Sequence, residues 1–152
     1  MSALKGTALV TGASSGIGAV YADRLANRGY DLILVARNEE RLKEVAGRIA
    51  NATGRSVTIL PADLNDKTAL AKVEAVLKEN PAITMLVNNA GFGSAVPLLQ
   101  VDIDKMEEMI DINVRALTRL TYAAAPAFAS RGAGTIINIS SIVGIAPEML
   151  NG

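Results

Sequence analysis

The sequence predicts an α/β fold in which a doubly wound parallel sheet carries helices on both faces. Short, continuously apolar segments alternate with longer segments whose apolar residues recur at helical spacing. The short segments lack the apolar–polar alternation of a half-exposed strand, and this is typical of a parallel sheet that is covered on both sides. Right-handed crossovers between such strands give a doubly wound fold, and the expected order of its five strands is 3-2-1-4-5.

Five apolar runs are the predicted strands. They are residues 7–11, 32–35, 57–60, 85–87 and 135–139. Gly132 and Gly134 interrupt the chain before the last of them. That strand would leave an unpaired apolar edge, so we expect this chain either to associate through that edge or to be the ordered part of something longer. A homo-oligomer is expected for the complete protein.

Four amphipathic segments are the predicted helices. Residues 17–28 form the first, and Gly29 follows it in the position of a C-terminal glycine. Asn38 is placed to cap the second, and Asn65 or Asp66 to cap the third. Residues 104–130 form a long fourth helix, which Pro126 is expected to bend or to end early.

The composition indicates one globular domain over residues 1–152 and excludes several kinds of function. Half of the residues are hydrophobic, and 15 basic residues balance 15 acidic ones, so we expect neither nucleic acid nor a membrane as partner. There is no cysteine and no histidine, so no metal site is expected, and proton transfer must use Asp, Glu, Lys or Tyr. No secretory signal or membrane-spanning run is seen, and a cytoplasmic protein is expected.

A glycine-rich turn joins the first predicted strand to the first predicted helix. It reads Thr11-Gly12-Ala13-Ser14-Ser15-Gly16-Ile17-Gly18. Glycines allow a tight turn and a close approach to a ligand, and the helix that follows directs free N–H groups toward an anion. Ser14 and Ser15 add hydroxyl groups that can bond a phosphate. A plain turn is the alternative, but the place between strand and helix favours a dinucleotide site.

The end of the second strand indicates which dinucleotide. An acidic residue there would accept the ribose hydroxyls of NAD, whereas this strand ends in Val35-Ala36-Arg37. The guanidinium of Arg37 can pair with a 2′-phosphate, which favours NADP(H). A solvated loop charge is the alternative interpretation of Arg37.

Polar and small residues follow the third and fourth strands, at the edge where open α/β sheets bind ligands. Asp63, followed by Leu64, could receive the adenine amino group or could cap a helix. Asn88-Asn89-Ala90-Gly91 could allow close approach of a ligand or could form an ordinary turn.

Three further polar residues are candidates for a functional role. Asn113 falls within an apolar stripe of the long helix, which predicts a buried amide that needs a structural or a catalytic partner. Ser140 and Ser141 end the fifth strand, where a serine can bond a substrate oxygen. No histidine is present to activate them as nucleophiles.

In order and spacing, these motifs resemble the single-domain branch of the short-chain dehydrogenase/reductase family. The resemblance rests on the glycine turn, Asp63, Asn88 to Gly91, Asn113 in Ile112-Asn113-Val114, and Ser141 in Asn138-Ile139-Ser140-Ser141. It implies a Rossmann-type domain and hydride transfer between a nicotinamide cofactor and a small alcohol or carbonyl substrate.

The resemblance also implies roles for these residues. Gly12 to Gly18 would hold the pyrophosphate and Arg37 the 2′-phosphate. Asp63 would contact adenine, and Asn88 to Gly91 would line the adenosine side. Ser141 would position the substrate oxygen, and Asn113 would hold a water of the proton relay.

One part of the family pattern is missing from these 152 residues. The general acid of the family is a tyrosine in Tyr-x-x-x-Lys downstream of the serine, and the sequence reaches Gly152 at about the point where this motif should begin. None of Tyr21, Tyr30 and Tyr122 has a lysine four residues later. We expect a C-terminally incomplete domain that is inactive alone; a non-catalytic module that binds or senses NADP(H) is the alternative.

Overall fold

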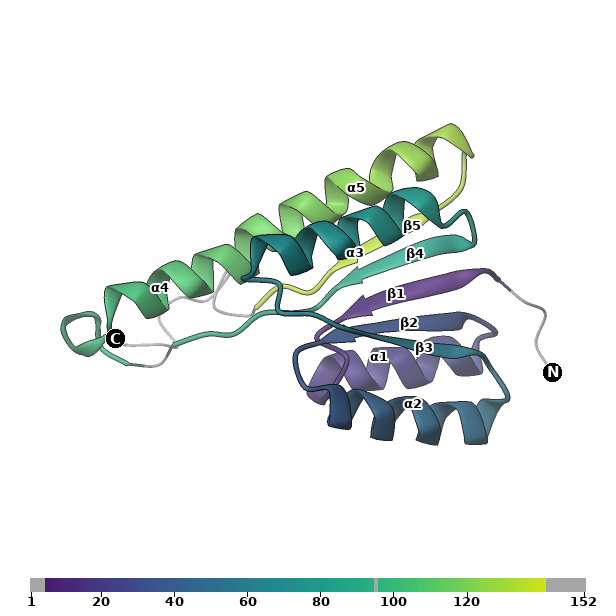
Figure 1. The fold of residues 1–152 in the computed structure, drawn as a ribbon, viewed down its shortest axis with the longest axis horizontal. Coiled ribbons are helices and arrows are strands. Elements are labelled where there is room, and N and C mark those ends of the chain that lie inside the picture. The colour runs from purple at the N-terminus through teal and green to yellow at the C-terminus, as the bar shows by residue number, and fades with distance from the viewer. Residues whose placement is uncertain (1–4, 95, 142–152) are drawn as a thin grey trace.

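The computed structural model describes residues 5–94 and 96–141, and it confirms the predicted sheet. Five parallel strands lie in the order β3-β2-β1-β4-β5 (Figure 1). They are β1 Thr7–Thr11, β2 Asp31–Ala36, β3 Val57–Pro61, β4 Ile83–Asn88 and β5 Thr135–Asn138. The order reverses between β1 and β4, so the connections that leave these two strands diverge and open a crevice at their carboxyl ends.

Helices cover both faces of the sheet (Figure 1). Helices α1 (Gly16–Asn27) and α2 (Glu39–Thr53) lie on one face, and α3 (Lys67–Glu79) and α5 (Leu117–Ser130) lie on the other. A short 3-10 helix, η1 (Leu98–Gln100), precedes α4 (Ile103–Ile110). A π-helical segment, η2 (Asp111–Ala116), joins α4 to α5 in one continuous helical run.

The core forms two layers because successive strand residues point to opposite faces. Leu9 and Leu86 pack with α3 and α5, and their neighbours Val10 and Val87 pack with α1 and α2. The inner strands β1, β2 and β4 are buried almost throughout, whereas the edge strands β3 and β5 are only partly buried.

Most of the predicted helix ends are confirmed. The side chain of Asn38 accepts a hydrogen bond from the backbone N–H of Arg41 at 2.9 Å. Asp66, rather than Asn65, caps α3 and accepts from the N–H of Ala69 at 2.7 Å. Gly29 follows α1 with φ of +97°, a conformation that glycine adopts at no steric cost.

The long fourth helix runs to Ser130 as predicted and does not end early at Pro126, and the burial of Ala124 and Phe128 holds the turns on both sides of the proline against the sheet. It differs from its prediction in one respect. Its middle widens into η2, in which hydrogen bonds run from i to i+5. Neither proline nor glycine occurs in η2, so no local feature of the sequence predicted it.

An ion pair joins α3 to α5. Glu74 is buried, and the guanidinium of Arg119 donates to both of its carboxylate oxygens, the longer contact being 3.0 Å. The carboxylate raises the pKa of Arg119 above its ordinary value through these hydrogen bonds and its charge. Lys78 approaches the same carboxylate at 3.7 Å. The two cations offset the cost of burying the charge of Glu74.

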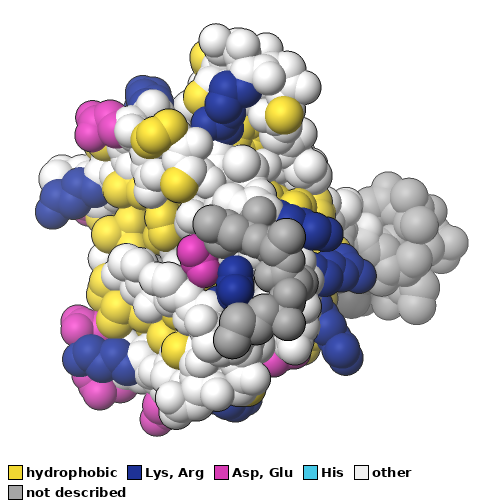
Figure 2. All heavy atoms as spheres, turned by 90° about the vertical axis from the view of Figure 1, so that its right-hand side faces the viewer, with side chains coloured by type: hydrophobic (Ala, Val, Ile, Leu, Met, Phe, Trp, Pro, Cys, Tyr) yellow, Lys and Arg dark blue, Asp and Glu magenta, His cyan; other side chains and the backbone are white. Residues whose placement is uncertain are grey.

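The amino-terminal edge of the sheet faces the viewer in Figure 2. Lys and Arg side chains are interspersed there with Asp and Glu side chains, in keeping with the zero net charge of the sequence. In the part of the chain that the structure describes, no helix is both long and apolar enough to cross a bilayer.

The glycine turn packs closely against the first turn of α1. A Cβ at Gly18 would collide with the carbonyl oxygen of Gly12 and would lie 2.5 Å from the side-chain nitrogen of Asn89. Backbone cannot yield as a flexible side chain does, so this contact requires glycine at position 18. Gly47 on α2 is the opposite case, because a Cβ there would meet nothing within 4 Å.

We therefore predict opposite effects for two chemically identical substitutions. Gly18→Ala should lower the free energy of unfolding by about 1–3 kcal/mol because the added methyl overpacks the turn. Gly47→Ala should raise it by roughly 0.5–1 kcal/mol, because alanine favours an exposed helix position. Urea unfolding followed by circular dichroism measures both. Equal stability of the two variants would contradict the packing described for Gly18.

Candidate active site

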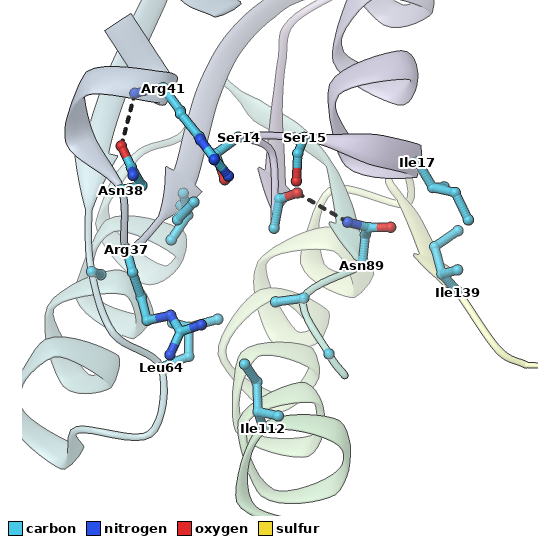
Figure 3. A pocket seen from close by; sticks show the side chains of 16 residues that line it. Ser14, Ser15, Ile17, Arg37, Asn38, Arg41, Leu64, Asn89, Ile112 and Ile139 are labelled. Carbon is cyan, nitrogen blue, oxygen red and sulfur yellow. Dashed lines mark hydrogen bonds between the residues drawn. The ribbon is translucent and has the colours of Figure 1, made fainter. Parts of the chain in front are cut away.

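A cavity of about 800 Å³ opens at the carboxyl ends of the strands, where the strand order reverses. Figure 3 shows side chains from the glycine turn, the starts of α1 and α2 and the ends of β4 and β5 around it. Its lining includes eight of the residues predicted to bind cofactor: Gly12, Ser14, Ser15, Ile17, Arg37, Leu64, Ala90 and Gly91. The predicted residues Gly16, Gly18, Asp63, Asn88, Asn113 and Ser141 are not part of that lining.

Hydrogen bonds between β1 and β4 build the wall nearest the glycine turn. The buried hydroxyl of Thr11 accepts from the N–H groups of Asn89 and Ala90, both at 3.0 Å. The side-chain NH₂ of Asn89 donates to the carbonyls of Thr11 at 3.0 Å and of Gly12 at 3.2 Å. Figure 3 shows the contact of Asn89 with the turn. These bonds fix the position of the turn relative to the rest of the cavity.

The start of α1 is suited to an anion. Ser15 precedes the helix in an extended conformation, and its side chain makes no capping hydrogen bond. Gly16 has φ of +53°, which a side chain rarely adopts. The first helical N–H groups have no acceptor within the helix, and there is no acidic residue in the first turn. The positive end of the helix dipole therefore faces the cavity without a competing carboxylate.

Two arginines line the opposite end of the cavity. Arg37 follows β2 and lies beside Leu64, and Arg41, from the first turn of α2, extends toward Ser14 (Figure 3). Both are exposed, and neither guanidinium makes a hydrogen bond or ion pair with another residue that the structure describes. No Asp or Glu is among the described residues of the lining. The cavity thus concentrates positive charge.

Sequence reasoning missed Arg41 as a site residue. The signal was present, because Arg41 lies one helical turn after Arg37 in a helix that begins at the carboxyl edge of the sheet. Asn89 lines the cavity as part of the predicted segment Asn88 to Gly91, whereas Asn38, Ile112 and Ile139 also line it and were not predicted. Two of these three adjoin a predicted residue, so the motifs identified the loops better than the individual side chains.

Asp63 is not a helix cap, so that alternative was wrong. Its carboxylate accepts from the backbone N–H of Asn65 at 3.0 Å, which closes a short turn before α3, and Asp66 is the cap. This turn presents Leu64 to the cavity. Leu64 is buried and packs into the core on the α3 and α5 side.

Asn88 lies beneath the cavity. It is 3% exposed, and its NH₂ donates to the hydroxyl of Thr121 at 3.1 Å and to the side-chain oxygen of Asn138 at 2.9 Å. It therefore ties β4 to α5 and β5. Its neighbour Asn89 points to the glycine turn, as the alternation of side chains along a strand requires.

Asn113 is exposed, so the predicted burial of its amide was wrong, but it does have the partner that the prediction required. Its oxygen accepts from the N–H of Phe92 at 3.1 Å, and its NH₂ donates to the carbonyl of Phe92 at 2.8 Å. The π-helical turn of η2 rotates Asn113 out of the stripe that regular helical spacing predicts. A Cβ at Gly91 would collide with the side-chain oxygen of Asn113, which explains the glycine there.

The end of the cavity away from the arginines is apolar. Ile17 from α1 and Ile139, which follows β5, lie side by side there (Figure 3). Ser141 is exposed two residues beyond Ile139. The carboxyl edge of β5 thus carries the predicted catalytic serine beyond the apolar end of the cavity.

A family model described as "short chain dehydrogenase" matches residues 6–151 of the chain. A very-long-chain 3-oxoacyl-CoA reductase of Anas platyrhynchos is 36% identical over 148 residues, which are 94% of this chain and 47% of that protein. The chain spans about half the length of the curated relatives it matches.

Solved structures give the same result. A short-chain dehydrogenase from Sphingobium yanoikuyae in complex with NADPH matches with a TM-score of 0.93 and 48% identity, over 95% of this chain and 57% of that one. The bulky-bulky ketone specific alcohol dehydrogenase from Comamonas testosteroni matches with a TM-score of 0.92 and 43% identity, over 95% of this chain and 58% of that one. With its motifs and strand order, the chain belongs to the short-chain dehydrogenase family.

Proposed function

We propose that this chain carries the NADP(H)-binding part of an oxidoreductase that interconverts a small alcohol and a carbonyl compound. One observation carries the proposal: the cavity at the carboxyl edge has two unpaired guanidinium groups and no carboxylate among its described lining residues. That charge suits a dinucleotide with an additional phosphate. The relative from Sphingobium yanoikuyae, whose structure was solved in complex with NADPH, supports the choice of cofactor.

The chemical difference between the two ends of the cavity favours one orientation of the cofactor. We assign the 2′-phosphate to Arg37 and the adenine to the end formed by Leu64, with Asp63 beside it. The pyrophosphate would lie against the turn from Gly12 to Gly18, where free N–H groups begin α1. The nicotinamide would then reach the apolar end, near Ile17 and Ile139.

The small residues after β4 would line the adenosine side of this path. Ala90 and Gly91 belong to the cavity wall, and a side chain at Gly91 would displace Asn113. Asn88 would act from beneath by fixing the strand that carries them. We propose this supporting role for Asn88 in place of direct contact with the cofactor.

Ser141 and Asn113 are the proposed catalytic residues. Bound NADPH would supply the hydride, and Ser141 would hold the substrate oxygen by a hydrogen bond at the end of β5. Both polar groups of the Asn113 side chain are engaged by the backbone of Phe92. We therefore propose that Asn113 positions the loop after β4, in addition to its expected place beside a water of the proton relay.

Further parts of the proposal concern the whole protein. We propose that residues 1–152 are a single domain that lacks part of the family pattern, in a cytoplasmic homo-oligomer. The substrate would be met by residues 92–94 and 142–150, of which the latter lie outside the described residues. A module that only senses NADP(H) is not favoured, since the matched relatives include proteins named as reductases.

The role of Arg37 leads to a prediction of cofactor preference. Arg37→Ala should weaken NADPH binding by about 10- to 100-fold, because a charge-assisted contact with the 2′-phosphate is lost. NADH lacks that phosphate and should bind with unchanged affinity. Fluorescence titration of the nicotinamide measures both dissociation constants.

Arg48 on α2 offers a matched control, since it is exposed and does not line the cavity. Arg48→Ala should bind both cofactors as the original chain does. An equal loss for NADPH and NADH in Arg37→Ala would refute the assignment of the 2′-phosphate to Arg37.

The missing Tyr-x-x-x-Lys pattern leads to a second prediction. The 152-residue chain should bind NADPH but should not oxidise it, since general acid–base groups contribute roughly 10²–10⁴-fold to rate and this pair is lacking. The absorbance of NADPH at its nicotinamide band, followed with a panel of ketones and aldehydes, tests this. Substrate-dependent oxidation above the rate without protein would contradict it.

A further inference from the structure

The π-helical segment η2 binds the loops that follow β4 and β3, two strands that β1 and β2 separate in the sheet. Asn113 binds the backbone of Phe92, in the segment after β4. Arg115, two residues later, binds the backbone carbonyl of Asn65, in the turn after β3, at 2.9 Å. The cavity-lining residue Ile112 also comes from this segment. One irregular stretch of helix thus contacts both loops at the carboxyl edge.

Arg115 is held in place for this contact. The same terminal nitrogen that reaches Asn65 lies 2.9 Å from the carboxylate of Asp111, one turn earlier in η2. The side chain is only 26% exposed, and its Nε is buried without a hydrogen-bond partner. Burying the Nε of Arg115 without a partner costs free energy. The side chain nevertheless keeps the position in which its terminal nitrogen binds Asn65.

Arg115 binds the turn that we assign to adenine. Asn65 donates its N–H to the carboxylate of Asp63, so a shift of the Asn65 backbone moves Asp63 as well. Leu64, between them, lines the cavity beside Arg37. The carbonyl held by Arg115 therefore belongs to the short turn that shapes this end of the cavity.

We propose that Arg115 is a positioning residue for adenosine: it fixes the Asp63–Asn65 turn against η2 and thereby sets the affinity for the adenosine half of the cofactor. The inference rests on the proposed cofactor site. Arg115 itself does not line the cavity, so it acts through Asn65 and not by touching the cofactor.

The test compares two arginines of the same helical run in the 152-residue chain. Arg115→Met removes the hydrogen bond to Asn65 and the ion pair with Asp111, and it keeps the apolar stem. Arg119→Met makes the same change one turn later, where the arginine binds Glu74 and lines no part of the cavity. NADPH and NADH dissociation constants come from fluorescence titration, and thermal unfolding reports stability.

We expect Arg115→Met to weaken NADPH and NADH equally, by about tenfold, since both contain adenosine. Arg115→Lys, which keeps a cation able to reach one acceptor, should recover part of the affinity. Arg119→Met should lower the unfolding temperature but leave both dissociation constants unchanged. Unchanged binding in a folded Arg115→Met variant, or an equal loss in Arg119→Met, would overturn the proposal.

Two further readouts separate the possible failures. Should Arg115→Met not fold, Asp111→Asn releases the guanidinium from its charged partner and should weaken both cofactors by roughly threefold; unchanged binding would overturn the proposal. If the original chain binds neither cofactor, the proposed function fails. If the original chain binds NADPH and NADH, and the Arg115 variants bind both with the same dissociation constants, the positioning role alone fails.

Discussion

The site depends on the junction between the carboxyl ends of β1 and β4. There the hydroxyl of Thr11 accepts two backbone N–H groups, and it donates to the carbonyl of Val87 at 3.3 Å. The side chain of Asn89 completes the junction from the other strand by binding the carbonyls of Thr11 and Gly12. Because the residues involved lie nearly 80 positions apart in the sequence, the junction forms only when the sheet is assembled.

Everything else in the cavity is arranged around this junction. It fixes the glycine turn, and the turn sets where α1 begins and where the N–H groups of its first turn point. On one side lie Arg37 and Arg41, and on the other lie Ile17 and Ile139. The cavity has a charged end and an apolar end, and between them lies a helix start that favours anions. This order of surroundings matches the order of chemical groups along a dinucleotide with an additional phosphate.

The sequence predicted the elements better than it predicted the orientation of individual side chains. All five strands followed from apolar runs, and their order followed from the expected doubly wound fold. Cap chemistry predicted Asn38, but it left Asn65 and Asp66 as alternatives for the third helix. The prediction placed Asn113 in a buried stripe because it assumed regular helical spacing. The π-helical segment η2 breaks that spacing, and it contains no proline or glycine that would indicate the irregularity.

The choice between Asn88 and Asn89 also depended on tertiary structure. Two adjacent asparagines at the end of a strand point to opposite faces, and only the positions of β1, β5 and α5 decide which one meets the turn and which is buried. The spacing from Arg37 could have indicated that Arg41 lies near the cavity, but its approach to Ser14 depends on the direction in which α2 leaves the sheet. Local pattern identifies such loops, but tertiary packing assigns their side chains.

A crystal structure of the 152-residue chain with NADPH is the most direct test of the central claim. The account predicts the pyrophosphate against the N–H groups that begin α1, the 2′-phosphate within hydrogen-bond distance of Arg37, and the nicotinamide near Ile17 and Ile139. A cofactor whose 2′-phosphate lies away from Arg37, or whose nicotinamide occupies the arginine end, would contradict it.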